Sequence, residues 1–236
     1  MPPKSTNDAK VRRGLQSTNA LGFPCVILCG GRSKRMGQDK VTLPFGNGLL
    51  VQFCFQSMQK YFSEVFVCVK WDNGATSIPK QNIIAESNTP IDKTNTSLFS
   101  PLFGIKRAFE VLDSPFIAFM SVDSPFLNGR YFAELFTHLE EKNAQVAYIS
   151  QILSHQESKE HFLLSIWCKD TVEAIEKALQ KGEFKIASLI HTLNSTHINV
   201  RDKLLSINCN TKEEYQNALK ILECLDSKAS FQKQSL

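Results

Sequence analysis

One short stretch of the chain limits its fold and its ligands more than any other. The apolar run at residues 23–29 reads as a buried β-strand, and it breaks directly into Gly30 and Gly31. Glycines allow a tight turn and a close approach to a ligand, and successive backbone N–H groups in such a turn bind anions. Residues 32–40 then hold one acid, Asp39, and four cations: Arg32, Lys34, Arg35 and Lys40. We therefore predict a triphosphate-binding site, because a turn without a ligand would leave the four cations without a purpose.

The rest of the chain alternates between strand and helix patterns, which indicates a three-layer α/β/α domain with a mostly parallel sheet. We expect strands at residues 23–29, 65–69, 81–85, 115–122, 146–149, 162–167 and 204–207. We expect helices at residues 49–61, 101–112, 129–142, 171–180, 184–193 and 211–224, with Asn128 and Asp170 as N-caps. Such sheets bind ligands beyond the carboxyl ends of their strands, where the strand order reverses.

Length and charge predict one domain with two short appendages. A chain of 236 residues with 42% hydrophobic residues fits a single α/β domain, which we expect at residues 21–225. Residues 1–20 carry four cations against one acid and are expected to form a disordered basic extension, and residues 226–236 are expected to fray. The whole chain carries only +4, so the domain is nearly neutral and no nucleic-acid partner is expected.

The cysteines and the apolar runs bear on location. The seven cysteines are odd in number and include no Cys-x-x-Cys pair, which indicates a reducing cytoplasm rather than a disulfide framework. The five histidines show no metal-ligand spacing, so a zinc site is not expected. No apolar run approaches the length of a membrane span, so no membrane partner is expected.

A second candidate feature is Asp123, which follows the almost unbroken apolar run at residues 115–122. Such a run is typical of a strand covered on both faces, and an acid at its carboxyl end faces the ligand crevice. Magnesium usually takes one or two carboxylates together with substrate phosphates. Position alone leaves two interpretations open, a magnesium ligand and a turn or helix-cap aspartate. The phosphate-binding turn at Gly30 favours the magnesium ligand.

The glycine turn matches neither of two common phosphate loops. Walker A requires Gly-x-x-x-x-Gly-Lys-Ser/Thr, whereas Gly37 is followed by glutamine, and the dinucleotide fingerprint requires spaced glycines, whereas Gly30 and Gly31 are adjacent. The pattern Leu-x-Gly-Gly-x-Ser-x-Arg-Met-Gly-x-Asp-Lys at residues 28–40 closely resembles the signature of nucleotidyltransferases. It resembles most the molybdenum cofactor guanylyltransferases of the MobA type. The resemblance covers roughly residues 22–224 and implies a Rossmann-like nucleotidyltransferase fold.

The resemblance implies a set of nucleotide-binding residues. The segment Ser-Pro-Leu-Phe-Gly at residues 100–104 is similar to a Gly-Pro-Leu-Ala-Gly motif that borders the guanine base, although it is also a plain helix start. Glu86 stands where the family usually has an Asp that contacts the nucleotide, and its alternative is a solvated loop carboxylate. The implied set is Leu28, Cys29, Gly30, Gly31, Arg32, Ser33, Lys40, Glu86, Pro101, Leu102 and Asp123.

The sequence motifs that indicate where the acceptor binds are weaker than those for the nucleotide. Asn208 and Asn210 lie in a segment similar to the family's late Asn-x-Asn-Thr-Pro-Glu-Glu motif, which implies contact with a pterin-bearing acceptor. The alternative is structural, with Asn210 or Thr211 as the cap of the closing helix. His161 lies near the place of a substrate-site histidine in the family but lacks the Pro-Thr that accompanies it, so we expect a surface histidine. Cys68 is given no role.

These features predict the magnesium-dependent transfer of a nucleoside monophosphate from an NTP to a phosphorylated acceptor, with release of pyrophosphate. Arg35, Lys40 and Asp123, the last as the Mg²⁺ ligand, are the expected catalytic residues. The resemblance implies GTP as donor, molybdenum-loaded molybdopterin as acceptor and molybdopterin guanine dinucleotide as product. It also allows for transient contact with enzymes that make or receive the cofactor. The alternatives are a cytidylyl- or sugar-phosphate nucleotidyltransferase with the same loop, and a nucleotide-binding protein without activity.

Overall fold

The structure is a computed structural model that describes residues 20–30, 39–70, 77–86 and 100–234. The predicted basic extension lies outside the described residues, apart from Ala20. Gly31, Arg32, Ser33 and Arg35 of the predicted site also lie outside them. None of the helices in the described ranges combines the length and apolar character needed to cross a membrane.

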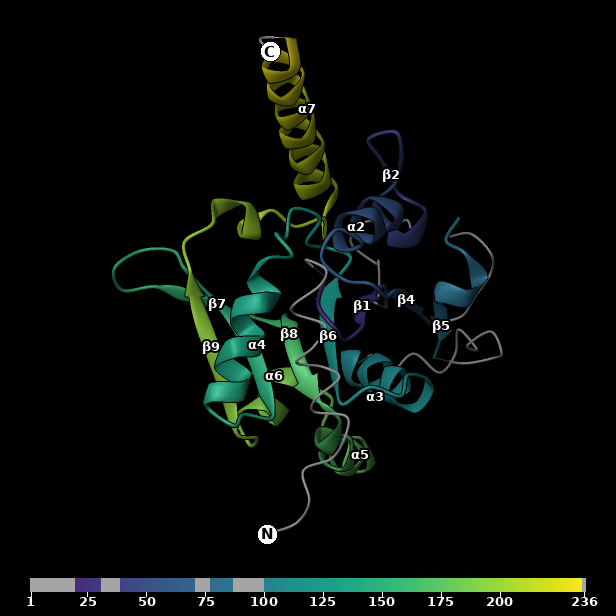
Figure 1. The fold of residues 1–236 in the computed structure, drawn as a ribbon, viewed down its shortest axis with the longest axis vertical. Helices are drawn as coiled ribbons and strands as arrows, with labels where there is room; N and C mark the ends of the chain where they lie inside the picture. Colours follow the sequence, from purple (N-terminus) through teal and green to yellow (C-terminus); the bar gives the residue numbers. More distant parts are fainter. Residues whose placement is uncertain (1–19, 31–38, 71–76, 87–99, 235–236) are drawn as a thin grey trace.

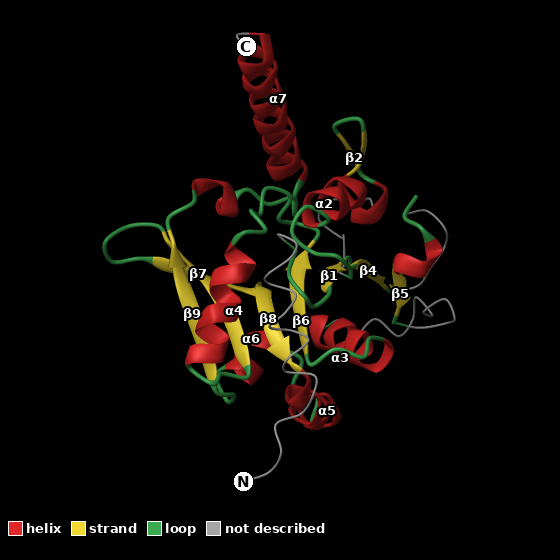
Figure 2. Ribbon diagram, in the orientation of Figure 1, coloured by secondary structure: helices red, strands yellow, loops and turns green. Residues whose placement is uncertain are grey.

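A seven-stranded sheet forms the centre of the molecule, in the order β5-β4-β1-β6-β8-β7-β9 (Figures 1 and 2). Its strands are β1 (Cys25–Leu28), β4 (Val65–Val69), β5 (Ile83–Ala85), β6 (Phe116–Ser121), β7 (Val146–Ile152), β8 (Ser158–Cys168) and β9 (Ser195–Val200). All neighbouring strands are parallel except that β8 is antiparallel to β6 and β7, because a short loop joins β7 directly to β8. The predicted mostly parallel sheet is confirmed.

Helices cover both faces of the sheet, which confirms the predicted three layers (Figure 2). The helices are α2 (Leu50–Met58), α3 (Pro101–Val111), α4 (Tyr131–Glu141), α5 (Val172–Gln180), α6 (Ile186–Ile190) and α7 (Lys212–Gln234). The apolar residues of α2, α4 and the first turns of α7 form one core with the sheet, and those of α3, α5 and α6 form the other. Short 3-10 helices occupy Lys40–Thr42 (η2), Lys80–Asn82 (η3), Lys169–Thr171 (η4) and Lys203–Ser206 (η5), and a small hairpin joins β2 (Pro44–Phe45) to β3 (Gly48–Leu49).

The central strand β1 shows why the middle of the sheet is apolar. All four of its residues are buried, and they alternate between the two cores. Cys25 and Ile27 pack on the α2 and α4 side, whereas Val26 and Leu28 pack on the α3 side. A strand covered on both faces needs an apolar residue at every position, so it reads as a continuous apolar run.

The last predicted strand, at residues 204–207, is wrong. Residues Lys203–Ser206 form the 3-10 helix η5, whose first turn is capped by Asp202: its Oδ1 accepts a hydrogen bond of 2.9 Å from the Leu204 N–H. The true edge strand is β9, just before it. Only the Ile198 and Val200 side chains of β9 are buried, and its other positions are polar. An edge strand with one buried face is short of apolar residues, which explains why its pattern is weak.

Three predicted helix ends are also wrong. Asn128 does not cap α4, because its Oδ1 accepts from the Arg130 N–H in the turn before the helix. Asp170 lies inside η4, and α5 begins after Thr171 without a side-chain cap. The closing helix does not end at Cys224, and residues 226–234, expected to fray, continue α7. These residues contain neither glycine nor proline, so nothing in the sequence stops the helix.

Candidate active site

The strand order reverses between β1 and β6. From β1 the chain passes to β4 and β5 on one side, and it then returns to place β6 on the other side. The two strands pair in parallel, with Leu28 opposite Ser121. Gly30 and Asp123 follow these strand ends, so the two features predicted from sequence meet at one edge of the sheet. Open α/β sheets bind ligands at such a reversal.

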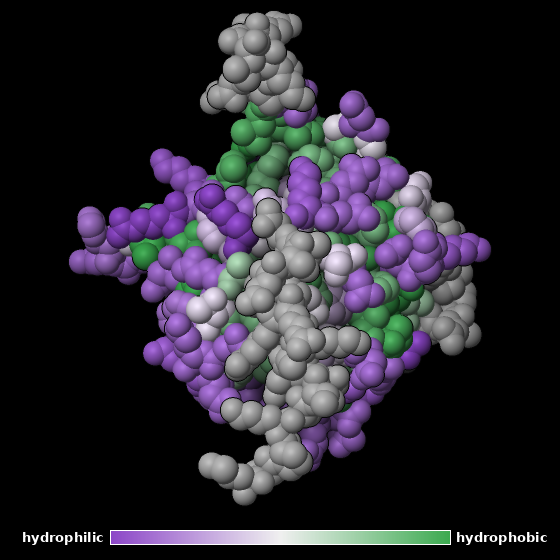
Figure 3. Space-filling view, in the orientation of Figure 1, coloured by the Kyte–Doolittle hydropathy of each residue, from purple (hydrophilic) through white to green (hydrophobic). Residues whose placement is uncertain are grey.

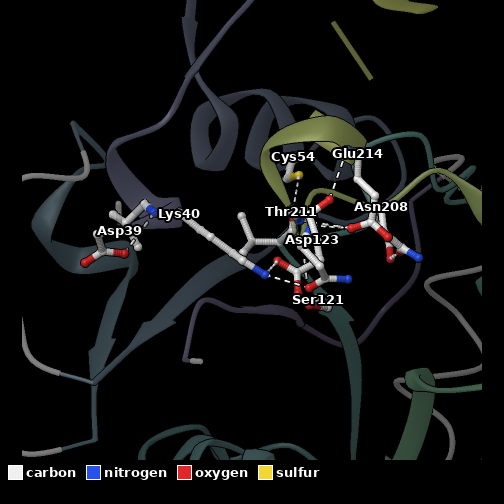
Figure 4. Close-up of polar contacts among 12 residues, drawn as sticks. Asp39, Lys40, Cys54, Ser121, Asp123, Asn208, Thr211 and Glu214 are labelled. Atoms are coloured by element: carbon white, nitrogen blue, oxygen red, sulfur yellow. Dashed lines mark hydrogen bonds and ion pairs between the residues drawn. The ribbon is translucent and has the colours of Figure 1, made fainter. Parts of the chain in front are cut away.

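Lys40, Asp123 and Asn210 converge at this edge from three distant parts of the chain. Figure 4 shows the Lys40 side chain reaching toward Asp123. The Lys40 Nζ lies 2.6 Å from the Asp123 Oδ1 and 2.7 Å from the Asn210 Oδ1. The Lys40 and Asp123 side chains are 12% and 23% exposed, so the pair is largely shielded but open to a ligand on one side. Asp39 fixes the start of η2 by accepting a hydrogen bond from the Val41 N–H, which holds the Lys40 backbone in place.

The Asp123 carboxylate is placed where it could hold a magnesium ion. Its Oδ1 is shared with Lys40, whereas its Oδ2 has no hydrogen-bond partner among the described residues. In the described ranges, no three His, Cys, Asp or Glu side chains cluster closely enough to hold a metal ion by themselves. Magnesium in a nucleotide site suits such a place, since it takes one or two carboxylates and completes its shell with phosphate oxygens and water.

The side chains of residues 208–211 have two different roles, since one caps α7 and another contacts the site. The Glu214 N–H donates to the Thr211 Oγ1, and the Glu214 Oε2 accepts from the Asn210 and Thr211 N–H groups. This is a capping box, so Thr211 caps α7 and the Asn210 side chain is left to contact Lys40. The Cys209 N–H donates to the Asp123 carbonyl oxygen over 3.1 Å and ties the segment to the end of β6. The Asn208 Oδ1 lies 3.5 Å from the Ser124 hydroxyl.

A second charged pair, Lys70 and Glu86, lies at the ends of β4 and β5. The two side chains form a salt bridge and are 20% and 10% exposed, so Glu86 is not a solvated loop carboxylate. Burial raises the pKa of Glu86, and the Lys70 charge opposes that rise. Both neighbouring glycines make room for this pair: a Cβ at Gly30 would lie 3.1 Å from the Lys70 Cε, and one at Gly104 would lie 3.2 Å from the Glu86 Oε1.

Lys70 is not among the site residues predicted from the sequence. Its signal is its position, directly after the carboxyl end of the strand at residues 65–69, where a cation faces the same edge as Gly30. Its ammonium nitrogen also lies 5.6 Å from the centre of the Phe103 ring. The nucleotide contact of Glu86 stays a prediction. Lys70 lies beside Glu86 at the ends of β4 and β5.

The motif at residues 100–104 forms the start of α3, as expected. The Ser100 Oγ accepts from the Leu102 N–H over 3.1 Å and donates to the Phe184 carbonyl over 2.7 Å, and Pro101 is the first helical residue. The Phe103 and Phe184 rings pack with their centres 6.1 Å apart. The contact of Pro101 and Leu102 with a base stays a prediction.

His161 is not a surface histidine, and this prediction is wrong. It lies within β8, is buried, and its Nε2 is 2.9 Å from the Gln151 Oε1. The Gln151 Nε2 donates to the Asp202 carbonyl over 2.7 Å and to the Ser206 Oγ over 2.8 Å. Since both amide hydrogens of Gln151 are used, its oxygen faces His161 and accepts, and the His161 Nε2–H is the donor. The chain of bonds joins β7, β8 and the segment after β9.

The His161 pKa predicts an acid-sensitive contribution to folding. Burial first, and the Lys159 charge second, lower the pKa of His161 from 6.5 to about 4. The unfolded chain therefore binds a proton that the folded protein refuses between pH 6.5 and 4, so stability falls as the pH drops through this window. The histidine should account for about 3 kcal/mol of the loss. Urea unfolding of wild type and His161→Gln between pH 4 and 7.5 measures this, and equal pH slopes for the two proteins would contradict it.

Comparison with known proteins agrees with this geometry. The family model described as "MobA-like NTP transferase domain" matches residues 25–197. The chain belongs to the MobA-like NTP transferase family. It is therefore a nucleotidyltransferase, and the matched range contains Gly30, Lys40 and Asp123. The alternative of a nucleotide-binding protein without activity is set aside.

Two relatives show how far the likeness extends. The molybdenum cofactor guanylyltransferase of Helicobacter pylori (strain G27) is 30% identical over 208 residues, which cover 85% of this chain and 94% of the relative. A protein of the same name from Campylobacter jejuni (strain RM1221) is 28% identical over 192 residues, covering 81% of this chain and 93% of the relative. The likeness thus spans nearly the whole length of these MobA-like proteins.

Two solved structures share the fold. The molybdopterin-guanine dinucleotide biosynthesis protein A of Archaeoglobus fulgidus superposes with a TM-score of 0.67 at 16% identity, covering 85% of this chain and 99% of that one. The 2-C-methyl-D-erythritol 4-phosphate cytidylyltransferase of Thermus thermophilus superposes with a TM-score of 0.60 at 13% identity, covering 84% and 98%. The predicted Rossmann-like nucleotidyltransferase fold is confirmed.

Proposed function

We propose that this nucleotidyltransferase moves GMP from GTP to molybdenum-loaded molybdopterin, with Mg²⁺ as cofactor. The product would be molybdopterin guanine dinucleotide, and pyrophosphate would leave. The observation that carries the proposal is the meeting of Lys40, Asp123 and Asn210 at the point where the strand order reverses. The names of the relatives from Helicobacter and Campylobacter support the identity of the donor and the acceptor.

The donor would lie along the edge formed by β1, β4 and β5. Its phosphates would meet the backbone of the glycine turn after β1, together with Arg35 and Lys40. Its base would lie toward Glu86 and the start of α3, where Gly30 and Gly104 leave room beside the Lys70–Glu86 pair. The carboxylate of Glu86 suits a base edge that donates hydrogen bonds, and the guanine edge offers two such donors.

The chemistry needs charge stabilisation and positioning more than proton transfer. The terminal phosphate of the acceptor is already an anionic nucleophile, so it attacks the α-phosphorus without a general base. Lys40 and Arg35 would neutralise the charge that grows on the non-bridging and leaving oxygens. When bound on Asp123, magnesium would supply a further positive charge to the donor phosphates.

The Lys40 contact with Asp123 has a consequence for donor binding. In the free protein, the ammonium group is held by Asp123 and Asn210 rather than by phosphate. A donor phosphate would compete with Asp123 for this ammonium group. When the ammonium group moves to the phosphate, the Asp123 Oδ1 would become free. Asn210 and Asn208 would then face the acceptor, since their segment is tied to the end of β6.

The donor preference tests the proposal against its closest alternative. The solved relatives include cytidylyltransferases of the same fold, and this chain has Ser100 and Phe103 in the motif expected to border the base. Pyrophosphate release should be measured with GTP, CTP, ATP and UTP, each with Mg²⁺ and molybdenum-loaded molybdopterin. We expect kcat/KM for GTP to exceed the others at least about tenfold. A higher value for CTP would overturn the guanylyl assignment and favour the cytidylyl alternative.

The cysteines of the enzyme bear on its cellular location. We place the enzyme in the cytoplasm, on the odd number of cysteines and their spacing. We also propose transient contact with enzymes that load molybdenum or receive the finished cofactor. Mixing the enzyme with a cofactor-dependent apoenzyme, and measuring transfer in the presence of a chelating trap, would test such contact.

A further inference from the structure

The Glu86 carboxylate lies in a gap between two glycines from distant parts of the chain. A Cβ at Gly30, after β1, and a Cβ at Gly104, in the first turn of α3, would each lie 3.2 Å from the Glu86 Oε1. Both glycines thus approach the same oxygen, and a side chain at either position would press on it. We call this place the Gly30–Gly104 gap, and it lies where the donor base is proposed to bind.

The two carboxylate oxygens of Glu86 have different surroundings. The Oε2 accepts a hydrogen bond from the Lys70 Nζ, within the salt bridge. The Oε1 has no hydrogen-bond partner within the ranges that the structure describes. Since no fully buried side-chain oxygen in those ranges lacks a partner, the Oε1 is open to solvent. The Gly30–Gly104 gap therefore presents one carboxylate oxygen that a ligand can reach.

Lys70 is held in place on two sides. Its Nζ contacts the Glu86 Oε2, and it lies 5.6 Å from the centre of the Phe103 ring, a distance at which an aromatic face attracts a cation. The Phe103 ring packs in turn on Phe184. Figure 3 shows hydrophobic surface among hydrophilic side chains on the side of the molecule that holds α3 and β5. The ammonium group is thus anchored, and it fixes the carboxylate beside it.

Lys70 is also the cation that keeps the Glu86 carboxylate ionised. Burial raises the pKa of Glu86, and the charge and hydrogen bond of Lys70 lower it. A second cation, Arg107 of α3, forms an ion pair with Glu110. The Cys68 thiol at the end of β4 is neutral, because burial raises its pKa. Without Lys70, the buried carboxylate would take up a proton more readily, and a protonated carboxyl group donates as well as accepts.

An oxygen that only accepts hydrogen bonds distinguishes bases by their edges. Guanine carries its N1–H and its 2-amino group side by side, so this edge offers two donors. Adenine is a purine of the same size, but its N1 is an acceptor and it has no 2-amino group. A carboxylate in the Gly30–Gly104 gap would be paired by guanine and left unpaired by adenine. Sites that leave a polar group unpaired reject such a ligand strongly.

We propose that Lys70 is a positioning residue for donor selection: it holds the Glu86 carboxylate in the Gly30–Gly104 gap as an acceptor for the N1–H and 2-amino edge of guanine. This inference rests on the proposed function for the identity of the donor. Lys70 acts through Glu86, and it makes no contact with the reacting phosphates.

The test compares the Kd values for GTP and ATP in the presence of Mg²⁺ and without an acceptor. Each nucleotide displaces GTP that carries a fluorescent N-methylanthraniloyl group on its ribose. The two differ only in the base, so a loss of folded protein leaves the ratio of their Kd values unchanged. We expect wild type to favour GTP at least tenfold, on the order of one charge-assisted hydrogen bond, and Lys70→Met to favour it less than about threefold. The control, Lys177→Met, removes a lysine that is paired with Glu173 on α5 and should match wild type.

A second variant tests whether Lys70 acts through Glu86. Glu86→Gln keeps the shape but brings an amide group that donates, so it should also lose the preference for GTP. Adding Lys70→Met to Glu86→Gln should then change the ratio no further. A wild-type ratio in Lys70→Met or in Glu86→Gln would overturn the proposal. A reduction by the same factor in both backgrounds would overturn it too, because Lys70 would then act independently of Glu86.

These measurements use no acceptor, which separates the inference from the proposed function. If GTP is preferred through Lys70 but no pyrophosphate is released with molybdopterin, the proposed function fails and the role of Lys70 stands. If pyrophosphate is released while Lys70→Met keeps the wild-type ratio, the proposed function stands and the role of Lys70 is overturned. Equal binding of GTP and ATP by wild type would overturn that role as well.

Discussion

Asp123→Asn is expected to reduce turnover by about 10³-fold or more at every magnesium concentration. Asparagine keeps the volume and one oxygen, so Lys40 can still donate to it and the end of β6 should still pack. The variant loses the negative charge that favours a hard dication, because magnesium sheds water reluctantly and prefers anionic oxygen. Its melting temperature should stay within a few degrees of wild type.

The measurement is a magnesium titration of pyrophosphate release by wild type, Asp123→Asn and a control, Asp170→Asn. Asp170 is an exposed aspartate without a side-chain hydrogen bond among the described residues, so its amide should behave as wild type. A titration curve for Asp123→Asn that overlays wild type would place the metal elsewhere. Failure of the variant to fold would instead make Asp123 a structural turn residue.

Lys40→Ala is expected to lower kcat by about 10² to 10³, which corresponds to about 2–4 kcal/mol of lost transition-state stabilisation. The contact with Asp123 adds a second, opposite effect. Because the Lys40 ammonium occupies the Asp123 Oδ1, removing it should free that oxygen and tighten magnesium binding several-fold. Weaker turnover with tighter metal binding is a combination that simple unfolding does not produce.

Two measurements check this prediction: single-turnover kinetics for kcat, and the magnesium concentration that gives half-maximal rate. Lys181→Ala removes an exposed lysine and serves as the control. Wild-type kcat in Lys40→Ala would rule out the phosphate role. Unchanged or weaker magnesium binding would show that the Lys40–Asp123 contact does not compete with the metal.

The parts of the fold that sequence could predict are those whose pattern depends on local burial alone. The strand Val65–Val69 was predicted to the residue, because it lies inside the sheet, is covered on both faces and is apolar at every position. The helix at Pro101 was placed well, since proline favours the first helical position. The edge strand β9 was missed, because an edge strand needs apolar residues on one face only and its neighbour η5 is more apolar.

The sequence could predict the site residues that follow strand ends, but not which side chains pair with one another. Gly30 and Asp123 could be expected side by side, because parallel strands bring their carboxyl ends to one edge. The partners of Lys40 could not, since Asp123 and Asn210 lie far along the chain and only tertiary packing brings them together. The pairing of Lys70 with Glu86 and the burial of His161 likewise depend on neighbours that no local pattern identifies.

The central position of β1 has a consequence for how the chain is made. Cys25 pairs with Val65 on one side but with Ala118 on the other, so the middle of the sheet closes late in synthesis. At about 5–20 residues per second, β6 follows β4 by roughly 3–10 s. During that time, one edge of an apolar strand stays unpaired on the nascent chain, which is a template for misassembly. We expect yield in cells to depend on translation speed and on chaperones that shield this edge, more than on the stability of the finished enzyme.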